Sequence, residues 1–242
     1  MNLIIDIGNT ATKLAVFQSD KIIEVRTVAT IDILAEVEKL RHSFPELQKG
    51  LLSAVSTVDK LQLETLQKLL PITILEPSMQ MPFKNSYKTP LTLGVDRLAL
   101  MAAAVDQCPK SNVLVIDAGS CITFDFMDAD QNYLGGAISP GIEMRYKSLE
   151  TFTSNLPLLQ KKIPRNQIGN STETSIHSGV INGLLYEMEG AIKAYQNKYP
   201  DLTVILTGGD ADFLCKQFKI SIFANSNFLL EGLNFLLEFN SN

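Results

Sequence analysis

The chain has 242 residues, of which 45% are hydrophobic and 19% charged, so it is not a disordered polypeptide and has room for one large or two small domains. Its 26 acidic against 21 basic side chains give a formal net charge of −5, and we therefore expect no nucleic-acid partner. Three cysteines without a CxxC pair, and a start without signal-peptide features, favour a cytoplasmic protein with no membrane partner.

Hydrophobic periodicity and turn residues predict strands alternating with helices. In chain order we expect strands over residues 2–5, 14–18 and 22–28, a helix over 31–42, a strand over 51–55, a helix over 59–70, a strand over 72–75, a helix over 95–107, strands over 112–116, 123–127 and 133–139, helices over 140–149 and 175–199, a strand over 203–206, a helix over 210–217, a strand over 220–223 and a helix over 227–239. Long irregular segments are expected over 76–93 and 151–172, and loops of that length are usually functional.

One pattern occurs twice, about half the chain apart. The sequence IIDIG at residues 4–8 is echoed by VIDAG at 115–119, and each is an apolar strand that ends in Asp-x-Gly before hydroxyl residues and a hairpin. The repeat predicts a duplicated α/β fold with domains 1–110 and 111–242 and a ligand cleft between them. The alternative is chance, because Asp-x-Gly is common after strands.

The first Asp-x-Gly loop carries the groups that a phosphate requires. Asn9, Thr10 and Thr12 offer hydrogen-bond donors, Lys13 adds a positive charge, and Asp6 can hold a hydrated Mg²⁺ ion. Neither a Walker A sequence nor a GxGxxG fingerprint is present. The loop therefore predicts phosphate binding, and the alternative is an ordinary hairpin turn.

Two further loops extend this prediction to a nucleotide. In the second Asp-x-Gly loop, Asp117 can hold a cation, and Ser120 and Thr123 can donate to phosphate. Gly208 and Gly209 follow a strand at the start of a helix, where bare backbone and helix amides can face a base or sugar. Three such loops at strand ends indicate a nucleotide site.

The sequence GVDR opens the apolar helix expected after the long loop 76–93. In the functional interpretation Asp96 accepts a hydroxyl proton during phosphoryl transfer and Arg97 clamps an anion. The alternative is a helix-capping Asp beside a solvated Arg.

Six motifs in order make the chain resemble type III pantothenate kinases, within the superfamily of acetate and sugar kinases, Hsp70 and actin. They are DIGNT, GVDR, DAGSCIT, GGAISPGIEMRYKSL, STETSIHSG and TGGDA. The resemblance implies duplicated ribonuclease H-like (actin-like ATPase) domains with mixed sheets flanked by helices. It also implies transfer of the ATP γ-phosphoryl group to the hydroxymethyl group of pantothenate, which gives 4′-phosphopantothenate in the first step of coenzyme A biosynthesis.

The same resemblance implies a role for particular residues, with Asp96 as the general base. The residues implied to bind ATP are Asp6, Ile7, Gly8, Asn9, Thr10, Ala11, Thr12, Lys13 and Ser120. Those implied to bind pantothenate are Tyr87, Gly94, Val95, Asp96, Arg97 and Thr172. Asp117 would bind K⁺ or NH₄⁺, Mg²⁺ would accompany ATP, and the protein would be a homodimer with the substrate site at or near its interface.

A few positions depart from the pattern of the family. Ser120 stands where Thr is commoner, Cys121 where Ala is commoner, and Ser171 where Asn is expected before Thr172. Two other functions stay open: a small sugar or acid kinase with another acceptor, and an ATP-binding regulatory or filament protein.

Overall fold

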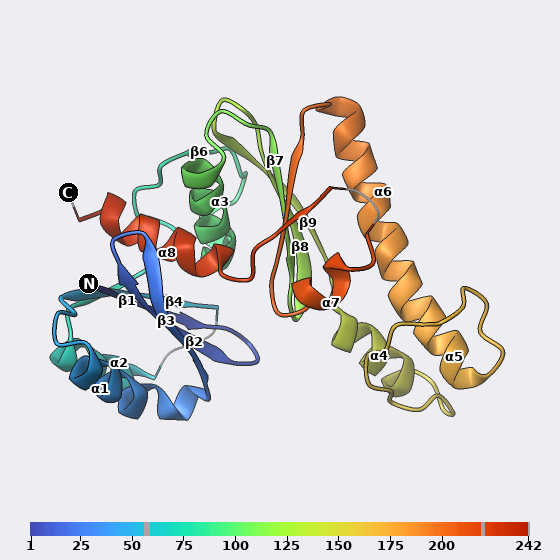
Figure 1. The fold of residues 1–242 in the computed structure, drawn as a ribbon, viewed down its shortest axis with the longest axis horizontal. Helices are drawn as coiled ribbons and strands as arrows, with labels where there is room; N and C mark the ends of the chain where they lie inside the picture. Colours follow the sequence, from blue (N-terminus) through green and yellow to red (C-terminus); the bar gives the residue numbers. More distant parts are fainter. Residues whose placement is uncertain (56–58, 219–220, 242) are drawn as a thin grey trace. The chain divides into compact units, whose positions relative to one another are not determined.

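The computed structural model describes residues 1–55, 59–218 and 221–241 and divides the chain into two compact units (Figure 1). Unit 1 comprises Met1–Lys110, Gln131–Tyr133 and Asn227–Asn242. Unit 2 comprises Ser111–Asp130 and Leu134–Ser226. The domain limits 1–110 and 111–242 stay a prediction, and the two units are described separately below.

Unit 1 is built on a five-stranded mixed sheet of order β3-β2-β1-β4-β5, in which β1 is antiparallel to β2 and parallel to β4. The strands of this sheet are β1 (Asn2–Ile7), β2 (Thr12–Gln18), β3 (Lys21–Val28), β4 (Lys49–Ala54) and β5 (Ile72–Ile74). Unit 1 also contains the short β6 (Lys84–Asn85), which is a strand of the other sheet. Its helices are α1 (Ile33–Ser43), α2 (Lys60–Leu69), α3 (Val95–Gln107) and α8 (Phe228–Phe239).

The alternation of side chains along β1 assigns the two faces of this sheet. The odd-numbered apolar residues of β1 pack with α1 and α2 in one buried core, on the side that Figure 1 shows covered by those helices. The even-numbered residues face α8 and α3, since the Asn2 side-chain amide donates to Asn234 Oδ1 on α8 at 2.8 Å. Asp6 therefore projects from the face that carries α3 and α8.

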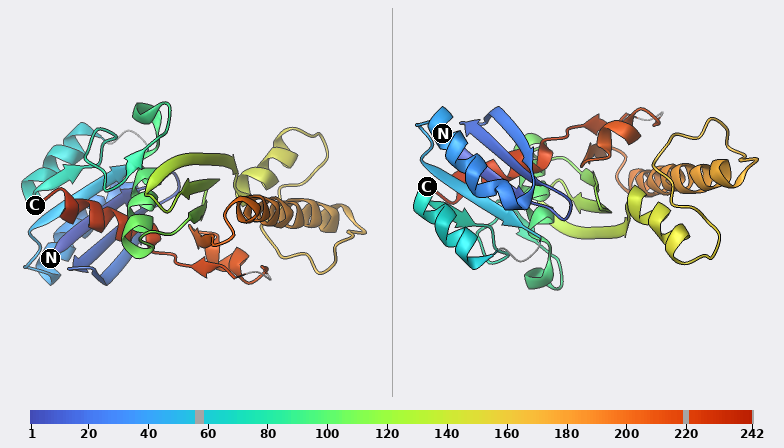
Figure 2. Two further views of the ribbon diagram at one scale, coloured as in Figure 1. Left: turned by 90° about the horizontal axis from the view of Figure 1, so that it is seen from above. Right: turned by 90° about the horizontal axis from the view of Figure 1, so that it is seen from below.

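Unit 2 is built on a second mixed sheet, and the whole sheet has the order β11-β10-β7-β8-β9-β6. Its strands are β7 (Val113–Ala118), β8 (Cys121–Met127), β9 (Asn132–Pro140), β10 (Thr203–Thr207) and β11 (Phe223–Ala224). Its helices are α4 (Ile142–Thr151), α5 (Thr172–His177), α6 (Gly183–Lys198) and α7 (Ala211–Cys215). A π-helical turn joins α5 to α6 into one rod, beside which the segment after α4 loops out (Figure 2). No helix in the part of the chain that the structure describes is long and apolar enough to cross a membrane.

The two sheets repeat one topology. Each has a central strand (β1 or β7) that is antiparallel to the next strand in the chain and parallel to its other neighbour, β4 or β10. Helices also lie at matching points: α2 precedes β5 and α7 precedes β11, and the next α-helices after these strands are α3 and α8. The predicted fold class, duplicated mixed sheets flanked by helices, is confirmed.

Several expected elements have different bounds in the structure. The helix expected from residue 140 begins at Ile142, because Pro140 ends β9 and Gly141 caps the helix. The helix expected from residue 175 begins at Thr172, where Ser171 and Thr174 form a reciprocal capping box. Residue 220 of the strand expected over 220–223 lies outside the described residues.

Candidate active site

Asp6 is the best-defined functional group of unit 1. Its neighbours in the sheet register are Lys13 on β2 and Ser53 on β4, whose side chains share its face. Asp6 is only 8% exposed, and this burial raises its pKa to about 6. Lys13 opposes the rise, while the negative charge of Asp96 adds to it. The buried Asp6 carboxyl therefore lies near one positive charge, Lys13, and one further negative charge, Asp96.

The turn after Asp6 presents its polar residues unequally. The Gly8 amide donates to the Ala11 carbonyl at 3.2 Å and closes the turn, which leaves Asn9 and Thr10 exposed at its tip. Thr12 lies on the opposite face of the sheet, and its hydroxyl is 3.1 Å from the hydroxyl of Thr30. The structure therefore brings Lys13 to Asp6 and directs the Thr12 side chain away.

Asp96 lies in the first turn of α3, and Gly94 is the residue that caps this helix. The Asp96 Oδ1 atom accepts a hydrogen bond from the Arg97 amide at 2.9 Å, and the positive end of the helix dipole stabilises the carboxylate. A Cβ atom at Gly94 would overlap Asp96 Oδ1, so the glycine makes room for this carboxylate. Its charge is close enough to act on Asp6. Unit 1 thus holds two neighbouring carboxylates on different elements.

Arg97 and Tyr87 meet beside these acids. The Arg97 side chain is nearly buried, at 5% exposure, and its guanidinium carbon lies 5.6 Å from the centroid of the Tyr87 ring. This distance is within the range of a cation–π interaction. Val95, also buried, fixes the first turn of α3 against the core. The structure therefore brings Tyr87, in the predicted loop, together with the GVDR segment that follows the loop.

In unit 2, Asp117 occupies the position on β7 that Asp6 occupies on β1. Gly208 at the end of β10 has φ +95°, and a Cβ atom there would overlap Asp117 Oδ1 and the Ala118 carbonyl oxygen. Thr123 is the neighbour of Asp117 on β8, and among the described residues its buried hydroxyl has no hydrogen-bond partner. Ser120 is exposed in the turn between β7 and β8, and its carbonyl accepts from the Gly141 amide at 3.2 Å.

These oxygens suit hard cations. A carboxylate from Asp117 and an unpaired hydroxyl from Thr123 are donors of the kind that K⁺ accepts, and the Asp6 and Asp96 carboxylates are donors that a hydrated Mg²⁺ accepts. Within residues 1–55, 59–218 and 221–241, no group of three or more His, Cys, Asp or Glu side chains is arranged to hold a metal ion.

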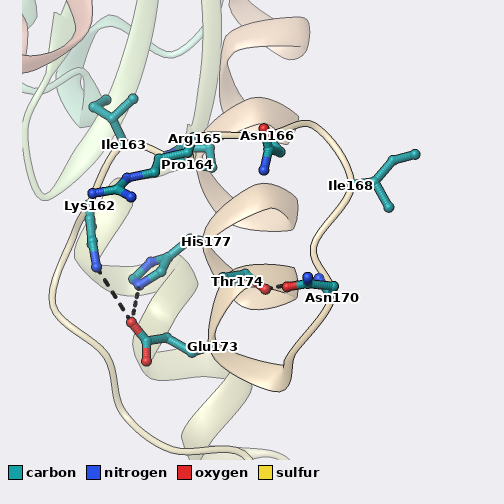
Figure 3. A pocket seen from close by; sticks show the side chains of 10 residues that line it. All are labelled: Lys162, Ile163, Pro164, Arg165, Asn166, Ile168, Asn170, Glu173, Thr174 and His177. Atoms are coloured by element: carbon teal, nitrogen blue, oxygen red, sulfur yellow. Dashed lines mark hydrogen bonds and ion pairs between the residues drawn. The ribbon is translucent and has the colours of Figure 1, made fainter.

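Thr172 is exposed at the start of α5, next to a separate cavity in unit 2 of about 320 Å³ (Figure 3). Inside it, Glu173 Oε1 lies 3.7 Å from Lys162 Nζ and 3.6 Å from His177 Nε2, and His177 Nδ1 is 2.7 Å from the Tyr146 hydroxyl. The residues that line the cavity are Lys162, Ile163, Pro164, Arg165, Asn166, Ile168, Asn170, Glu173, Thr174 and His177. Thr172 itself is not among them.

Sequence reasoning missed two residues that contact the predicted ones. Ser53 lies beside Asp6, and a serine inside an apolar strand was the available signal. Tyr133 stacks on Tyr87, and no local pattern marks it because the contact joins distant segments. Lys161, in a basic cluster that the sequence places in a loop, forms an ion pair with Asp210 of the TGGDA motif.

The fold and the two Asp-x-Gly loops define a protein of the actin-like ATPase fold, which several sugar kinases share. A solved glucokinase from an Antarctic psychrotroph matches with a TM-score of 0.51 over 98% of both chains, at 12% identity, which shows the fold alone. A Baf family protein from Campylobacter jejuni, named as a transcriptional activator, matches with a TM-score of 0.67 over 99% of both chains, at 25% identity.

The family follows from closer comparisons. The family model for type III pantothenate kinase matches residues 2–194. A type III pantothenate kinase of Christiangramia forsetii is 53% identical over 240 residues, which cover 99% of each chain. The chain belongs to the type III pantothenate kinase family, and the resemblance predicted from its motifs is confirmed.

Proposed function

We propose that this protein transfers the γ-phosphoryl group of ATP to the hydroxymethyl group of pantothenate, and so catalyses the first step of coenzyme A biosynthesis. Family membership supports the reaction. The observation that carries the mechanism is the pair of neighbouring carboxylates, Asp6 and Asp96, in unit 1. Phosphoryl transfer requires an aligned acceptor and neutralised charge more than covalent chemistry, and such a pair serves both needs.

In this proposal Asp96 is the general base. Its carboxylate would accept the hydroxyl proton as the oxygen attacks phosphorus. The Arg97 amide donates to Asp96 Oδ1 and so holds the carboxylate in the first turn of α3. Gly94 supports the role because its missing side chain gives Asp96 its position.

The two substrates would contact different segments. ATP would contact residues 6–13, where exposed Asn9 and Thr10 offer donors, and would also contact Ser120. Pantothenate would contact Tyr87, residues 94–97 and Thr172. The Arg97 guanidinium, held over the Tyr87 ring, would bind the pantothenate carboxylate through charge-assisted hydrogen bonds.

The oxygen ligands described above support two cation sites, one for Mg²⁺ and one for K⁺ or NH₄⁺. Mg²⁺ would arrive with ATP, where it would neutralise phosphate charge, and Asp6 would hold it through water. Asp117, with the Thr123 hydroxyl beside it, would hold K⁺ or NH₄⁺. We also propose a cytoplasmic homodimer with its substrate site at or near the interface. Exposed apolar side chains on unit 2, among them Phe152 and Ile168, support an interface on that unit.

The test is to incubate pure protein with ATP, Mg²⁺, K⁺ and pantothenate and to measure 4′-phosphopantothenate by mass spectrometry. Asp96→Asn should keep ATP binding and lose turnover, whereas Asp106→Asn, at the exposed far end of α3, should keep both. Absence of product would contradict the function, and a panel of sugars and hydroxy acids would then reveal another acceptor. ATP hydrolysis that needs no acceptor would instead indicate a regulatory protein. Near-normal turnover in Asp96→Asn would exclude Asp96 as the base.

A further inference from the structure

A buried aromatic ring lies behind the residues that the proposed function assigns to pantothenate. Tyr133 is 0% exposed and is one of the largest fully buried side chains of the protein. Together with Gln131 and Asn132 it forms a short excursion of the chain into unit 1. Neither Tyr133 nor its neighbours belong to any predicted site motif.

The backbone of this excursion anchors the long loop that carries Tyr87. The Lys84 amide donates to the Gln131 carbonyl, and the Ser86 amide donates to the Tyr133 carbonyl, each at 3.0 Å. These bonds form the two-residue parallel pairing of β6 with the start of β9. They fix the chain at the residue just before Tyr87, in a loop that otherwise has little regular structure.

The side chain of Tyr133 then orients the Tyr87 ring. The two rings are stacked, with an interplanar angle of 5° and 6.2 Å between centroids. The edge of Phe83 packs on Tyr133 at 78° and 6.1 Å, so the Tyr133 ring has contacts of both stacked and edge type. Offset stacking and edge contacts are the favourable geometries for aromatic pairs, and they restrict how each ring can turn.

Tyr87 passes this restriction on to Arg97. Its ring lies 5.6 Å from the Arg97 guanidinium carbon, and an arginine has several rotatable bonds whose freedom must be lost before it can bind an anion in a fixed geometry. When the plane of the Tyr87 ring is fixed, the guanidinium has one favourable position over it. The Arg97 side chain then loses less conformational entropy when it binds an anion. The order of contacts is therefore Tyr133, Tyr87, Arg97.

We propose that Tyr133 is a positioning residue for the acceptor substrate: it sets the plane of Tyr87 and through it the place of the Arg97 guanidinium. The inference rests on the proposed function, in which Tyr87 and Arg97 contact pantothenate. In this proposal Tyr133 does not itself contact the substrate. Replacing Tyr133 should therefore weaken the binding of pantothenate and leave the binding of ATP unchanged.

Steady-state kinetics of the full-length enzyme test this assignment. Tyr133→Leu should raise the KM for pantothenate about tenfold, the size expected for one lost aromatic interaction, with the KM for ATP unchanged. Tyr133→Phe keeps the stacked ring and should raise the KM for pantothenate much less than Tyr133→Leu. Phe126→Leu removes a buried ring that is tilted against Tyr195 and Tyr199 in unit 2; it is the matched control and should leave both KM values unchanged.

A double variant separates positioning from general packing. If Tyr133 acts through Tyr87, then Tyr133→Leu combined with Tyr87→Leu should raise the KM for pantothenate no more than Tyr87→Leu alone. Additive effects, an equal rise in the KM for ATP, or an equal effect of Phe126→Leu would overturn the proposal. Should Tyr133→Leu not fold, Tyr133→Met provides the same loss of stacking with a more adaptable side chain. A wild-type enzyme inactive on pantothenate would refute the proposed function, whereas an active one with an unchanged KM in Tyr133→Leu would refute this inference alone.

Discussion

Replacing Asp6 with asparagine should stabilise the free protein at neutral pH while removing its catalytic activity. The Asp6 carboxyl is buried, and burial together with the charge of Asp96 outweighs the attraction of Lys13, so its pKa rises from 3.8 to about 6. A carboxyl whose pKa is raised by folding favours the folded state below the unfolded pKa, and this contribution is lost as the pH rises through the folded pKa. The free energy of unfolding of the wild-type protein should therefore decrease as the pH rises from about 4 through about 6, because Asp6 ionises less readily in the folded state.

The size of the effect follows from the shift. A difference of about two pKa units corresponds to about 3 kcal/mol, of which about 2 kcal/mol falls between pH 4.5 and pH 7.5. Asparagine does not titrate and keeps the shape of the side chain. The free energy of unfolding of Asp6→Asn, relative to wild type, should consequently increase by about 2 kcal/mol over this interval.

Urea unfolding at the two pH values, in EDTA and without ATP, measures this difference. Glu64→Gln removes the same charge from an exposed position on α2 and serves as the control for general charge effects. A difference between Asp6→Asn and wild type that is the same at both pH values would refute the reasoning, as would an equal pH dependence in the Glu64 variant. In the kinase assay Asp6→Asn should be slower by about a hundredfold or more if Asp6 acts at the ATP phosphates as proposed, because the variant lacks the negative charge.

Three further outcomes are expected. Gly94→Ala should lower kcat by about a hundredfold with little change in the KM for ATP, because the new Cβ displaces the Asp96 carboxylate; an unchanged kcat would show that Asp96 needs no such space. Gly208→Ala should lower the free energy of unfolding in urea by about 1–3 kcal/mol, because position 208 has φ +95° and no room for a Cβ; equal stability would contradict this. Replacing K⁺ by Na⁺ should depress the rate of the wild type but not of Asp117→Asn, and equal wild-type rates would count against the Asp117 site.

Much of the fold could be predicted from local patterns. The apolar strands that end in Asp-x-Gly appear in the structure as β1 and β7, and the helix over 95–107 has the predicted bounds. These elements are predictable because burial, periodicity and turn residues agree within a short window. The start of α5 was placed too late, because Ser171 and Thr174 form a capping box in a stretch that looks irregular in sequence.

The surroundings of the site were less predictable. The motifs named Asp6 and Asp96, but the burial that raises the pKa of Asp6 comes from the packing of β1 between β2 and β4. Ser53 and Tyr133 belong to no motif, since each contacts its functional neighbour only after distant strands pair. Sequence motifs identify residues whose chemical type is required, such as Asp6 and Asp96. The residues that pack against them need only the right size and shape, so no motif identifies them.

The last helix shows the same limit on a larger scale. By its place in the repeated topology α8 corresponds to α3, and yet both belong to unit 1, where they pack against each other. The apolar residues 101–104 of α3 are buried in the structure. The helix that presents Asp96 and Arg97 is thus packed against the end of the chain, and a contact between such distant segments leaves no trace in either local sequence. A repeat in sequence therefore identifies equivalent elements, but only packing decides which of them support one site.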